Sequence, residues 1–164
     1  MDPMIRKLRQ EDLSQVAAIE KATQGLPWMD KIFYDCFQAG YPSWVQEEGD
    51  KIISFVIVSF HGDECHLLNL GVHPHYQRQG FGTQMLEYVM HSAKQLGAMM
   101  IYLEVRESNE RAIALYQKMH FAHIGTREDY YPAYEGRENG LIYARDLDSQ
   151  DVPKGLDSTN ANSG

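Results

Sequence analysis

The chain has 164 residues, and 15 basic against 23 acidic side chains give it a formal net charge of -8 at pH 7. This length suits one domain with a core of its own and is too short to expect two. The acidic balance works against sequence-independent binding to nucleic acid and favours a cationic partner. Because an acidic surface also serves solubility, the charge alone does not identify that partner.

No apolar stretch approaches the roughly 18 residues that suggest a membrane span, and the amino terminus lacks the apolar segment of a secretory signal. We therefore expect a cytoplasmic protein with no membrane partner. The two cysteines, Cys36 and Cys65, are too few and too irregularly spaced for a disulfide framework or a zinc site. Both are expected to be reduced and buried as small hydrophobic side chains.

Hydrophobic periodicity and turn residues predict an alternation of strands and helices. In chain order the expected elements are a strand at 5–9, helices at 13–22 and 30–37, strands at 43–47, 52–60 and 65–72, a helix that ends at Gly97, a strand at 99–105, a helix over 111–119, and strands at 122–126 and 141–145. Asp12 or Glu11 can cap the first of these helices. The aromatic run Tyr130-Tyr131-Pro132-Ala133-Tyr134 is expected to form the loop between the last two strands.

This alternation predicts a single α/β domain over residues 1–147, with a mixed sheet and helices on both of its faces. The nearly continuous apolar run at 99–103 suits a strand that is covered on both sides. Polar and small residues dominate from Asp148 onward, so a disordered tail is expected at 148–164.

A loop that can bind phosphate follows the apolar strand at 67–72 and opens the next helix. Its sequence is Gln77-Arg78-Gln79-Gly80-Phe81-Gly82-Thr83. The first N–H groups of a helix have no partner inside it, and the peptide dipoles add partial positive charge there. Gly80 and Gly82 allow the backbone to come close to a pyrophosphate, and Arg78 adds a fixed positive charge. A plain turn before an amphipathic helix would carry similar glycines.

The segments that follow make the phosphate-binding interpretation more specific. The pattern Q-x-x-G-x-G, followed by E-V-R-x-S-N-x-x-A-I-x-L-Y-x-K-x-x-F, resembles the GNAT superfamily of N-acetyltransferases. The resemblance implies the GNAT fold, a single domain with a mixed, mostly antiparallel central sheet flanked by helices, and it implies acetyl-CoA as co-substrate. Cofactor contacts are then expected from Leu70, Gly71, Val72, Arg78, Gln79, Gly80, Phe81, Gly82, Thr83 and Asn109.

Glu104 lies near the carboxyl end of its strand, where ligands of open α/β sheets usually bind. Acetyl transfer to an amine requires that the ammonium lose a proton, and Glu104 can accept it, directly or through water. An ion pair with Arg106 or with a residue of a neighbouring strand is the alternative.

Tyr116 stands where the resemblance implies the acid that serves the departing thiolate. An amphipathic core aromatic is the alternative for Tyr116. Asn109 can contact the cofactor, cap its helix, or do both. Gly71 marks a close backbone approach or a bulge.

Within the superfamily the chain most resembles the RimI-type ribosomal-protein alanine N-acetyltransferases. The resemblance runs from about residue 5 to residue 147 and includes Leu26-Pro27-Trp28 and Tyr130-Tyr131-Pro132. It implies that the acceptor is the N-terminal alanine of a small-subunit ribosomal protein, with Trp28, Tyr130 and Tyr131 lining the peptide groove. Gln79 and Thr83 stand where many relatives carry arginine, which leaves fewer side-chain charges for the phosphates.

Two other functions stay open at this stage. The same scaffold can acetylate a small amine such as a polyamine, an amino acid or an aminoglycoside, or it can bind acyl-CoA without catalysis. No metal is expected, because His73-Pro74-His75 has no third ligand at a useful spacing. The cysteines have no sequence-adjacent base, so direct transfer is favoured over an acyl-cysteine intermediate.

Overall fold

The computed structural model describes residues 3–148, so the expected tail lies outside the described residues except for Asp148. The chain forms two compact units. Unit 1 comprises the residues up to Ser59 together with Leu68–Leu86, and unit 2 comprises Phe60–Leu67 and the residues from Glu87 onward.

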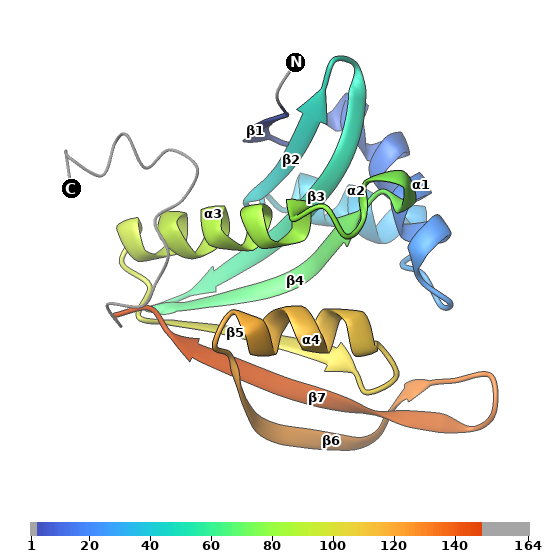
Figure 1. The fold of residues 1–164 in the computed structure, drawn as a ribbon, viewed down its shortest axis with the longest axis vertical. Helices are drawn as coiled ribbons and strands as arrows, with labels where there is room; N and C mark the ends of the chain where they lie inside the picture. The colour runs from blue at the N-terminus through green and yellow to red at the C-terminus, as the bar shows by residue number, and fades with distance from the viewer. Residues whose placement is uncertain (1–2, 149–164) are drawn as a thin grey trace. The chain divides into compact units, whose positions relative to one another are not determined.

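Four α-helices and seven strands make up the described part of the chain (Figure 1). They are β1 (Met4–Lys7), α1 (Leu13–Thr23), α2 (Asp30–Gln38), β2 (Ser43–Glu48), β3 (Lys51–His61), β4 (Glu64–Val72), α3 (Phe81–Gln95), β5 (Met100–Arg106), α4 (Glu110–Lys118), β6 (Ala122–Pro132) and β7 (Arg137–Asp146). Short 3-10 turns, η1 (Gln10–Asp12) and η2 (Pro74–Tyr76), precede α1 and α3. Apart from the last two strands, the predicted boundaries hold to within about two residues.

Backbone hydrogen bonds give the strand order β1-β2-β3-β4-β5-β7-β6. The β4–β5 pair is parallel, and the β1–β2, β2–β3, β5–β7 and β6–β7 pairs are antiparallel. The β4 strand contributes its first residues to unit 2 and its last residues to unit 1. The predicted mixed, mostly antiparallel sheet is therefore confirmed.

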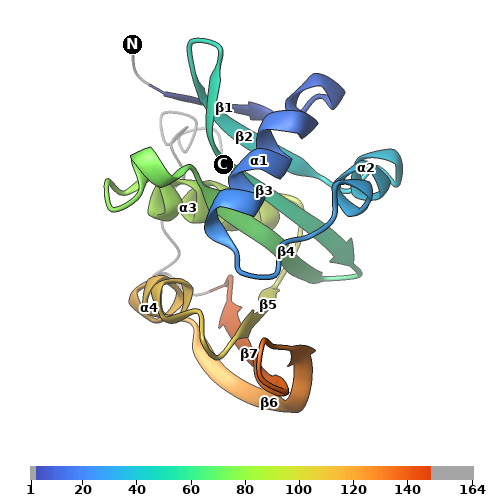
Figure 2. The same cartoon turned by 90° about the vertical axis from the view of Figure 1, so that its right-hand side faces the viewer.

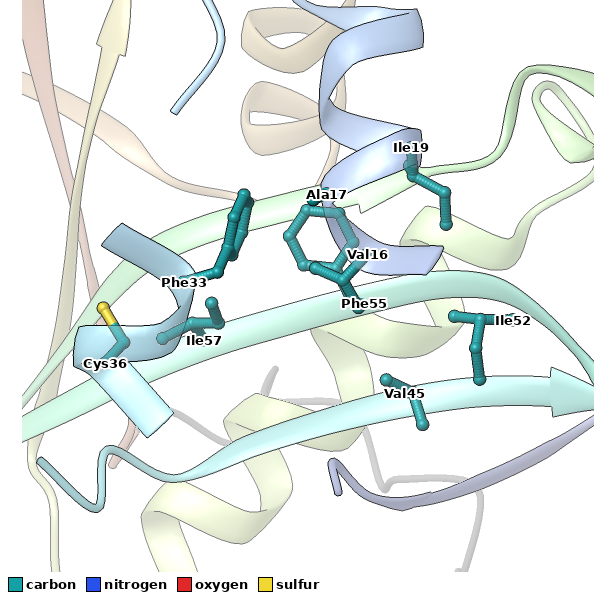
Figure 3. Packing of buried hydrophobic residues seen from close by; sticks show 9 residues of the cluster. All are labelled: Val16, Ala17, Ile19, Phe33, Cys36, Val45, Ile52, Phe55 and Ile57. Atoms are coloured by element: carbon teal, nitrogen blue, oxygen red, sulfur yellow. The ribbon is translucent and has the colours of Figure 1, made fainter. Parts of the chain in front are cut away.

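The core of unit 1 lies where α1 and α2 pack on β2 and β3 (Figure 3). Phe33 and Phe55 meet edge to face with ring centroids 5.7 Å apart, a geometry that aromatic rings prefer. Figure 2 shows α1 in front of β2 and β3. The cluster comprises Val16, Ala17, Ile19, Phe33, Cys36, Val45, Ile52, Phe55 and Ile57.

A buried polar chain connects β2 and β3 to the first turn of α3. The hydroxyl of Ser54 donates to the side-chain oxygen of Gln46 at 3.0 Å, and the amide of Gln46 donates to Gln84 at 2.9 Å. Gln46 and Ser54 are both almost fully buried. Since buried polar groups are costly unless paired, this chain fixes where α3 begins in unit 1.

Asp12 occupies the N-cap position of α1, as predicted, but its side chain makes no capping hydrogen bond to this helix. The Asp12 carboxylate accepts a bidentate pair of hydrogen bonds from Arg6, at 2.8 and 2.9 Å, and a third from the backbone N–H of Arg9 at 2.7 Å. Residues 10–12 form a 3-10 turn that leads directly into α1. The carboxylate therefore ties this turn to β1, and Arg6 also binds Glu47 of β2.

Two predictions about strands also change. Tyr130, Tyr131 and Pro132 belong to β6, which runs six residues further than expected before Ala133 begins the turn. Only one face of β5 is fully buried, since its burial alternates along the strand. Long-range pairing with β7 extends β6, which no local pattern at the aromatic run indicates.

Acidification tests the Asp12 network. Burial opposes ionisation of Asp12, but the hydrogen bonds from Arg6 and from the Arg9 N–H outweigh it and hold the pKa of this carboxyl below its ordinary 3.8. Asp12→Asn should lower the free energy of unfolding at pH 7 by about 1–3 kcal/mol. A depressed folded-state pKa means that the stabilisation is complete above the unfolded value and is lost below it.

The deficit of Asp12→Asn should therefore shrink as the pH falls below 3.8. Urea unfolding at a series of pH values measures it. Glu11→Gln is the matched control, because Glu11 makes only an exposed contact with Arg9 at 3.9 Å and should change stability little. A deficit that is constant from pH 7 to pH 3 would contradict the assignment.

Candidate active site

The predicted phosphate loop in unit 1 has the backbone shape that an anion site needs. Arg78 and Gly80 have positive φ angles of 63° and 89°. The carbonyl of Gly80 accepts the N–H of Gln84 at 3.0 Å, which is the first hydrogen bond of α3. The N–H groups of Phe81, Gly82 and Thr83 thus belong to the first turn of a 15-residue helix and have no intrahelical acceptor. N–H groups in this position can donate to phosphate oxygens.

Two glutamine side chains brace this loop from within. Gln77 donates to the carbonyl of Val72 at 3.1 Å, and Gln79 donates to the carbonyl of His75 at 3.1 Å. The amide of Gln79 holds the loop's shape and adds no charge to it. For binding an anion, this loop therefore offers backbone N–H groups held in place more than it offers side-chain charge.

Gly71 marks a close approach, one of the two alternatives that the sequence left open. A Cβ at Gly71 would lie 2.5 Å from Cε1 and 2.9 Å from Cζ of Phe55, closer than packed atoms can be. On the same strand, Asn69 donates to the buried carboxylate of Glu20 at 3.1 Å, and the backbone N–H of Trp28 donates to its other oxygen at 2.9 Å. Glu20 thus holds the Trp28 segment to β4 within unit 1.

In unit 2 the register of three strands places the charged residues on one face. Arg106 of β5 and Arg127 of β6 both pair with Gly140 of β7. Glu104 lies two residues before Arg106, so it points to the same side. Tyr131 pairs with Glu138, two residues from Gly140, and shares that side as well. In β5 the residues on this face are the half-exposed ones.

Glu104 is held by two neighbours on this face. Its Oε1 lies 2.7 Å from Nε of Arg127, and its Oε2 accepts the phenol O–H of Tyr131 at 3.3 Å. A Cβ at Gly140 would approach Cε2 of Tyr131 to 2.9 Å and Oε1 of Glu104 to 3.3 Å. The absent side chain at Gly140 is therefore what leaves room for the carboxylate and the phenol to meet across β7.

Arg106 fixes the ring of Tyr131. Its guanidinium lies 4.4 Å from the ring centroid, and it donates to the carbonyl of Pro132 at 2.8 Å and to Glu138 at 3.0 Å. Burial, together with the charge of Glu104 and the hydrogen bond to it, raises the pKa of Tyr131 to about 12. The phenol is thus protonated at neutral pH and donates to the carboxylate. The alternative of an ion pair is confirmed in part, because Glu104 pairs with Arg127 of β6, whereas Arg106 pairs with Glu138.

Tyr116 lies in α4, is 6% exposed, and packs against Phe121 with ring centroids 5.7 Å apart. Burial raises its pKa, so the phenol stays protonated and keeps an O–H that can donate. Asn109 caps α4, since its side-chain oxygen accepts the N–H of Ala112 at 3.2 Å, as predicted. Its amide nitrogen still has donors to offer a ligand.

The predicted residues thus divide between the units. Trp28 and the loop and strand residues at 70–72 and 78–83 belong to unit 1, whereas Glu104, Asn109, Tyr116, Tyr130 and Tyr131 belong to unit 2. Within unit 2 the structure brings Glu104 and Tyr131 together.

Sequence reasoning missed Arg127 and Gly140 as members of this site. Strand alternation would have placed both on one face, but only the register shows that they are neighbours of Glu104.

A pocket of about 430 Å³ in unit 1, between α1 and η2, is lined by residues such as Ile19, Ile52 and Pro74, and none of its lining residues was predicted for the site.

Other features of the described residues bear on earlier expectations. His73 and His75 meet edge to face at 5.2 Å, and residues 3–148 contain no cluster of three side chains able to hold a metal ion. Cys36 and Cys65 are free and buried as predicted, and burial raises the pKa of both thiols. Among helices in this range, none has the length and apolar character needed to cross a membrane.

The helix start after β4 in unit 1 and the carboxylate of Glu104 on β5 in unit 2 are each the kind of group that an acyltransferase uses. The chain belongs to the acetyltransferase (GNAT) family, whose model matches residues 4–121. The family resemblance predicted from the sequence is therefore confirmed, and the protein is an N-acyltransferase.

Several named relatives match nearly the whole described chain. The [ribosomal protein bS18]-alanine N-acetyltransferase of Escherichia coli K12 is 36% identical over 140 residues, which are 85% of this chain and 95% of that protein. The enzyme of that name from Haemophilus ducreyi is 34% identical over 142 residues, or 86% and 98% of the two chains. The crystal structure of the ribosomal-protein-S18-alanine N-acetyltransferase from Escherichia coli superposes with a TM-score of 0.83 at 34% identity, covering 88% of this chain and 94% of that chain.

Filling the space above Gly140 should impair acetyl transfer. Gly140→Ala brings a methyl group within 2.9 Å of Tyr131, so the phenol and Glu104 must shift. Turnover should fall about 10- to 100-fold, as misplaced reacting groups typically cause, with stability lowered by about 1–3 kcal/mol. Steady-state kinetics and thermal unfolding measure the two effects.

Gly125→Ala is the matched control for that variant. It lies on the same face of β6, but its Cβ would meet only Ile142, at an ordinary 3.7 Å. It should keep near-normal turnover. Equal losses in both variants would show that the space above Gly140 has no special role.

Proposed function

We propose that the protein transfers the acetyl group of acetyl-CoA to the N-terminal α-amino group of a protein, and that the acceptor is the N-terminal alanine of a small-subunit ribosomal protein in the cytoplasm. The observation that carries the proposal is the carboxylate of Glu104, held by Tyr131 on the half-exposed face of β5. The relatives of that name, which match 85% or more of this chain, support the acceptor.

Acetyl-CoA supplies an activated thioester when bound, and the chain offers groups suited to hold it. The first-turn N–H groups of α3 and the charge of Arg78 would bind the pyrophosphate. The backbone at Leu70, Gly71 and Val72 would hydrogen-bond the acetyl-pantetheine arm, and the amide of Asn109 would contribute a further donor.

Glu104 is proposed as the base. An α-ammonium has an ordinary pKa of about 7.7–8.0, so most of it is protonated at neutral pH and cannot attack a thioester. Glu104 would accept one proton from the ammonium, directly or through water, and leave the amine lone pair free to attack the acetyl carbonyl. The hydrogen bond from Tyr131 keeps the carboxylate oriented while it does so.

Tyr116 is proposed as the acid. When the tetrahedral intermediate collapses, the C–S bond breaks and CoA leaves as a thiolate. A phenol that burial keeps protonated can donate a hydrogen bond or a proton to the sulfur. Trp28, Tyr130 and Tyr131 are proposed to line the groove for the acceptor peptide, where aromatic rings supply contact area at low entropic cost.

The first test is acetyl-CoA-dependent thiol release. A short peptide with an N-terminal alanine should be acetylated, while its N-blocked twin should not react, because only the free peptide carries an amine. A panel of polyamines, amino acids and aminoglycosides completes the assay. Release with small amines alone would replace the proposed acceptor, and acetyl-CoA binding without any release would indicate a non-catalytic module.

Replacing the base tests its role directly. Glu104→Gln should lower turnover about 10²- to 10⁴-fold, change the pH profile, and leave acetyl-CoA affinity nearly unchanged. The control is Glu107→Gln, which removes an exposed carboxylate of the next loop that contacts Asn139. Wild-type activity of Glu104→Gln across the pH range would refute the base assignment.

A further inference from the structure

One oxygen of the proposed base is incompletely satisfied. Oε1 of Glu104 is buried, and no hydrogen-bond donor reaches it with acceptable geometry in the described part of the chain. Nε of Arg127 lies 2.7 Å away, so it supplies charge without a well-directed hydrogen bond. A buried carboxylate oxygen in this state gains from any cation that can both neutralise it and donate to it.

Arg127 is held more loosely than its neighbour Arg106. The side chain of Arg127 is 56% exposed, and its other contact is the ring of Tyr130, with a centroid distance of 5.2 Å. Arg106 is 21% exposed and is fixed by the Pro132 carbonyl and by Glu138. Half-exposed ion pairs stabilise little, because water screens them and long side chains lose entropy when ordered.

An incoming ammonium fits the place of Arg127. An α-ammonium carries the same charge and has three N–H donors, so it can give Oε1 the directed hydrogen bond that Arg127 does not give. Gly140 carries no side chain and pairs with Arg127, so the guanidinium reaches Glu104 across β7 while it also lies over the ring of Tyr130.

We propose that Arg127 is a displaceable counter-ion of Glu104 and that it sets the enzyme's affinity for the ammonium group of the acceptor. The inference rests on the proposed function, since it assigns Glu104 as the group that receives the acceptor's proton. In the free enzyme Arg127 neutralises the carboxylate. The acceptor ammonium replaces it, donates one proton to Oε1, and becomes the free amine. An acceptor without positive charge cannot compete for this position.

The rival role for Arg127 is to hold Glu104 in place throughout the reaction. The two roles predict different changes in acceptor binding when Arg127 is removed. If Arg127 competes with the acceptor, its removal strengthens acceptor binding. If Arg127 only orients Glu104, its removal weakens turnover and leaves binding of the free amine no better than before. The difference is measurable in binding, without any need for the reaction to proceed.

The test is a double-mutant cycle in peptide binding to the CoA complex, in which no acetyl group is available. The variants are Arg127→Gln, Glu104→Gln and the pair together. The ligands are a peptide with a free N-terminal alanine and its N-acetylated twin, and calorimetry gives Kd. Arg127→Gln should bind the free peptide about two- to fivefold more tightly, the range expected for loss of a half-exposed ion pair.

The gain should be absent for the N-acetylated twin and should vanish in the Glu104→Gln background, where no carboxylate remains to be contested. Arg137→Gln is the matched control, because Arg137 is an exposed arginine that binds the carbonyls of Asp129 and Tyr130. It should leave Kd unchanged if the fold of β6 persists. Arg127→Lys keeps the positive charge, so its Kd for the free peptide should stay close to that of the wild type.

Weaker or unchanged binding of the free peptide by folded Arg127→Gln would overturn the inference, as would an equal gain for both peptides. Failure of the wild type to bind the free peptide would overturn it too. Wild-type binding with the expected cycle, but without acetyl transfer from acetyl-CoA, would contradict the proposed function alone. Thermal unfolding of each variant confirms that the compared proteins are folded.

Discussion

The register of β7 between β5 and β6 is the constraint on which the candidate site of unit 2 depends. It sets Gly140 between Arg106 and Arg127 and aligns Glu104 with Ile142. Because side chains alternate along a strand, a shift of β7 by one residue would turn Gly140 away from this face and place a residue with a side chain next to Glu104. The missing side chain at Gly140 then leaves the space in which Glu104, Tyr131 and Arg127 come together.

In unit 1 as well, the proposed site depends on backbone groups and on positions without a side chain. Positive φ angles at Arg78 and Gly80 turn the chain just before α3, and two glutamine amides hold that turn. Gly71 lets β4 pass beside the ring of Phe55. Backbone groups therefore do most of the proposed phosphate binding.

The proposed chemistry depends on how firmly the structure holds Arg106, Arg127 and Tyr131 around Glu104. Arg106 is locked by three contacts and keeps Tyr131 in place, whereas Arg127 is half exposed and faces the carboxylate with poor geometry. A site that must accept an ammonium gains from such an arrangement, since a fixed charge would exclude the substrate and an unpaired carboxylate would be costly to bury. The acidic charge of the whole chain is consistent with a cationic acceptor.

The sequence by itself determined the family, the order of the elements and the cap at Asn109, because glycine positions, apolar periodicity and capping residues act within a few neighbouring residues. It also singled out Glu104 and Tyr131. Only the tertiary structure decided that Tyr130–Pro132 belong to β6, that Asp12 binds Arg6, and that Arg127 faces Glu104. Each of these depends on strand register or on a partner distant in sequence, and local residue patterns carry no information about such pairings.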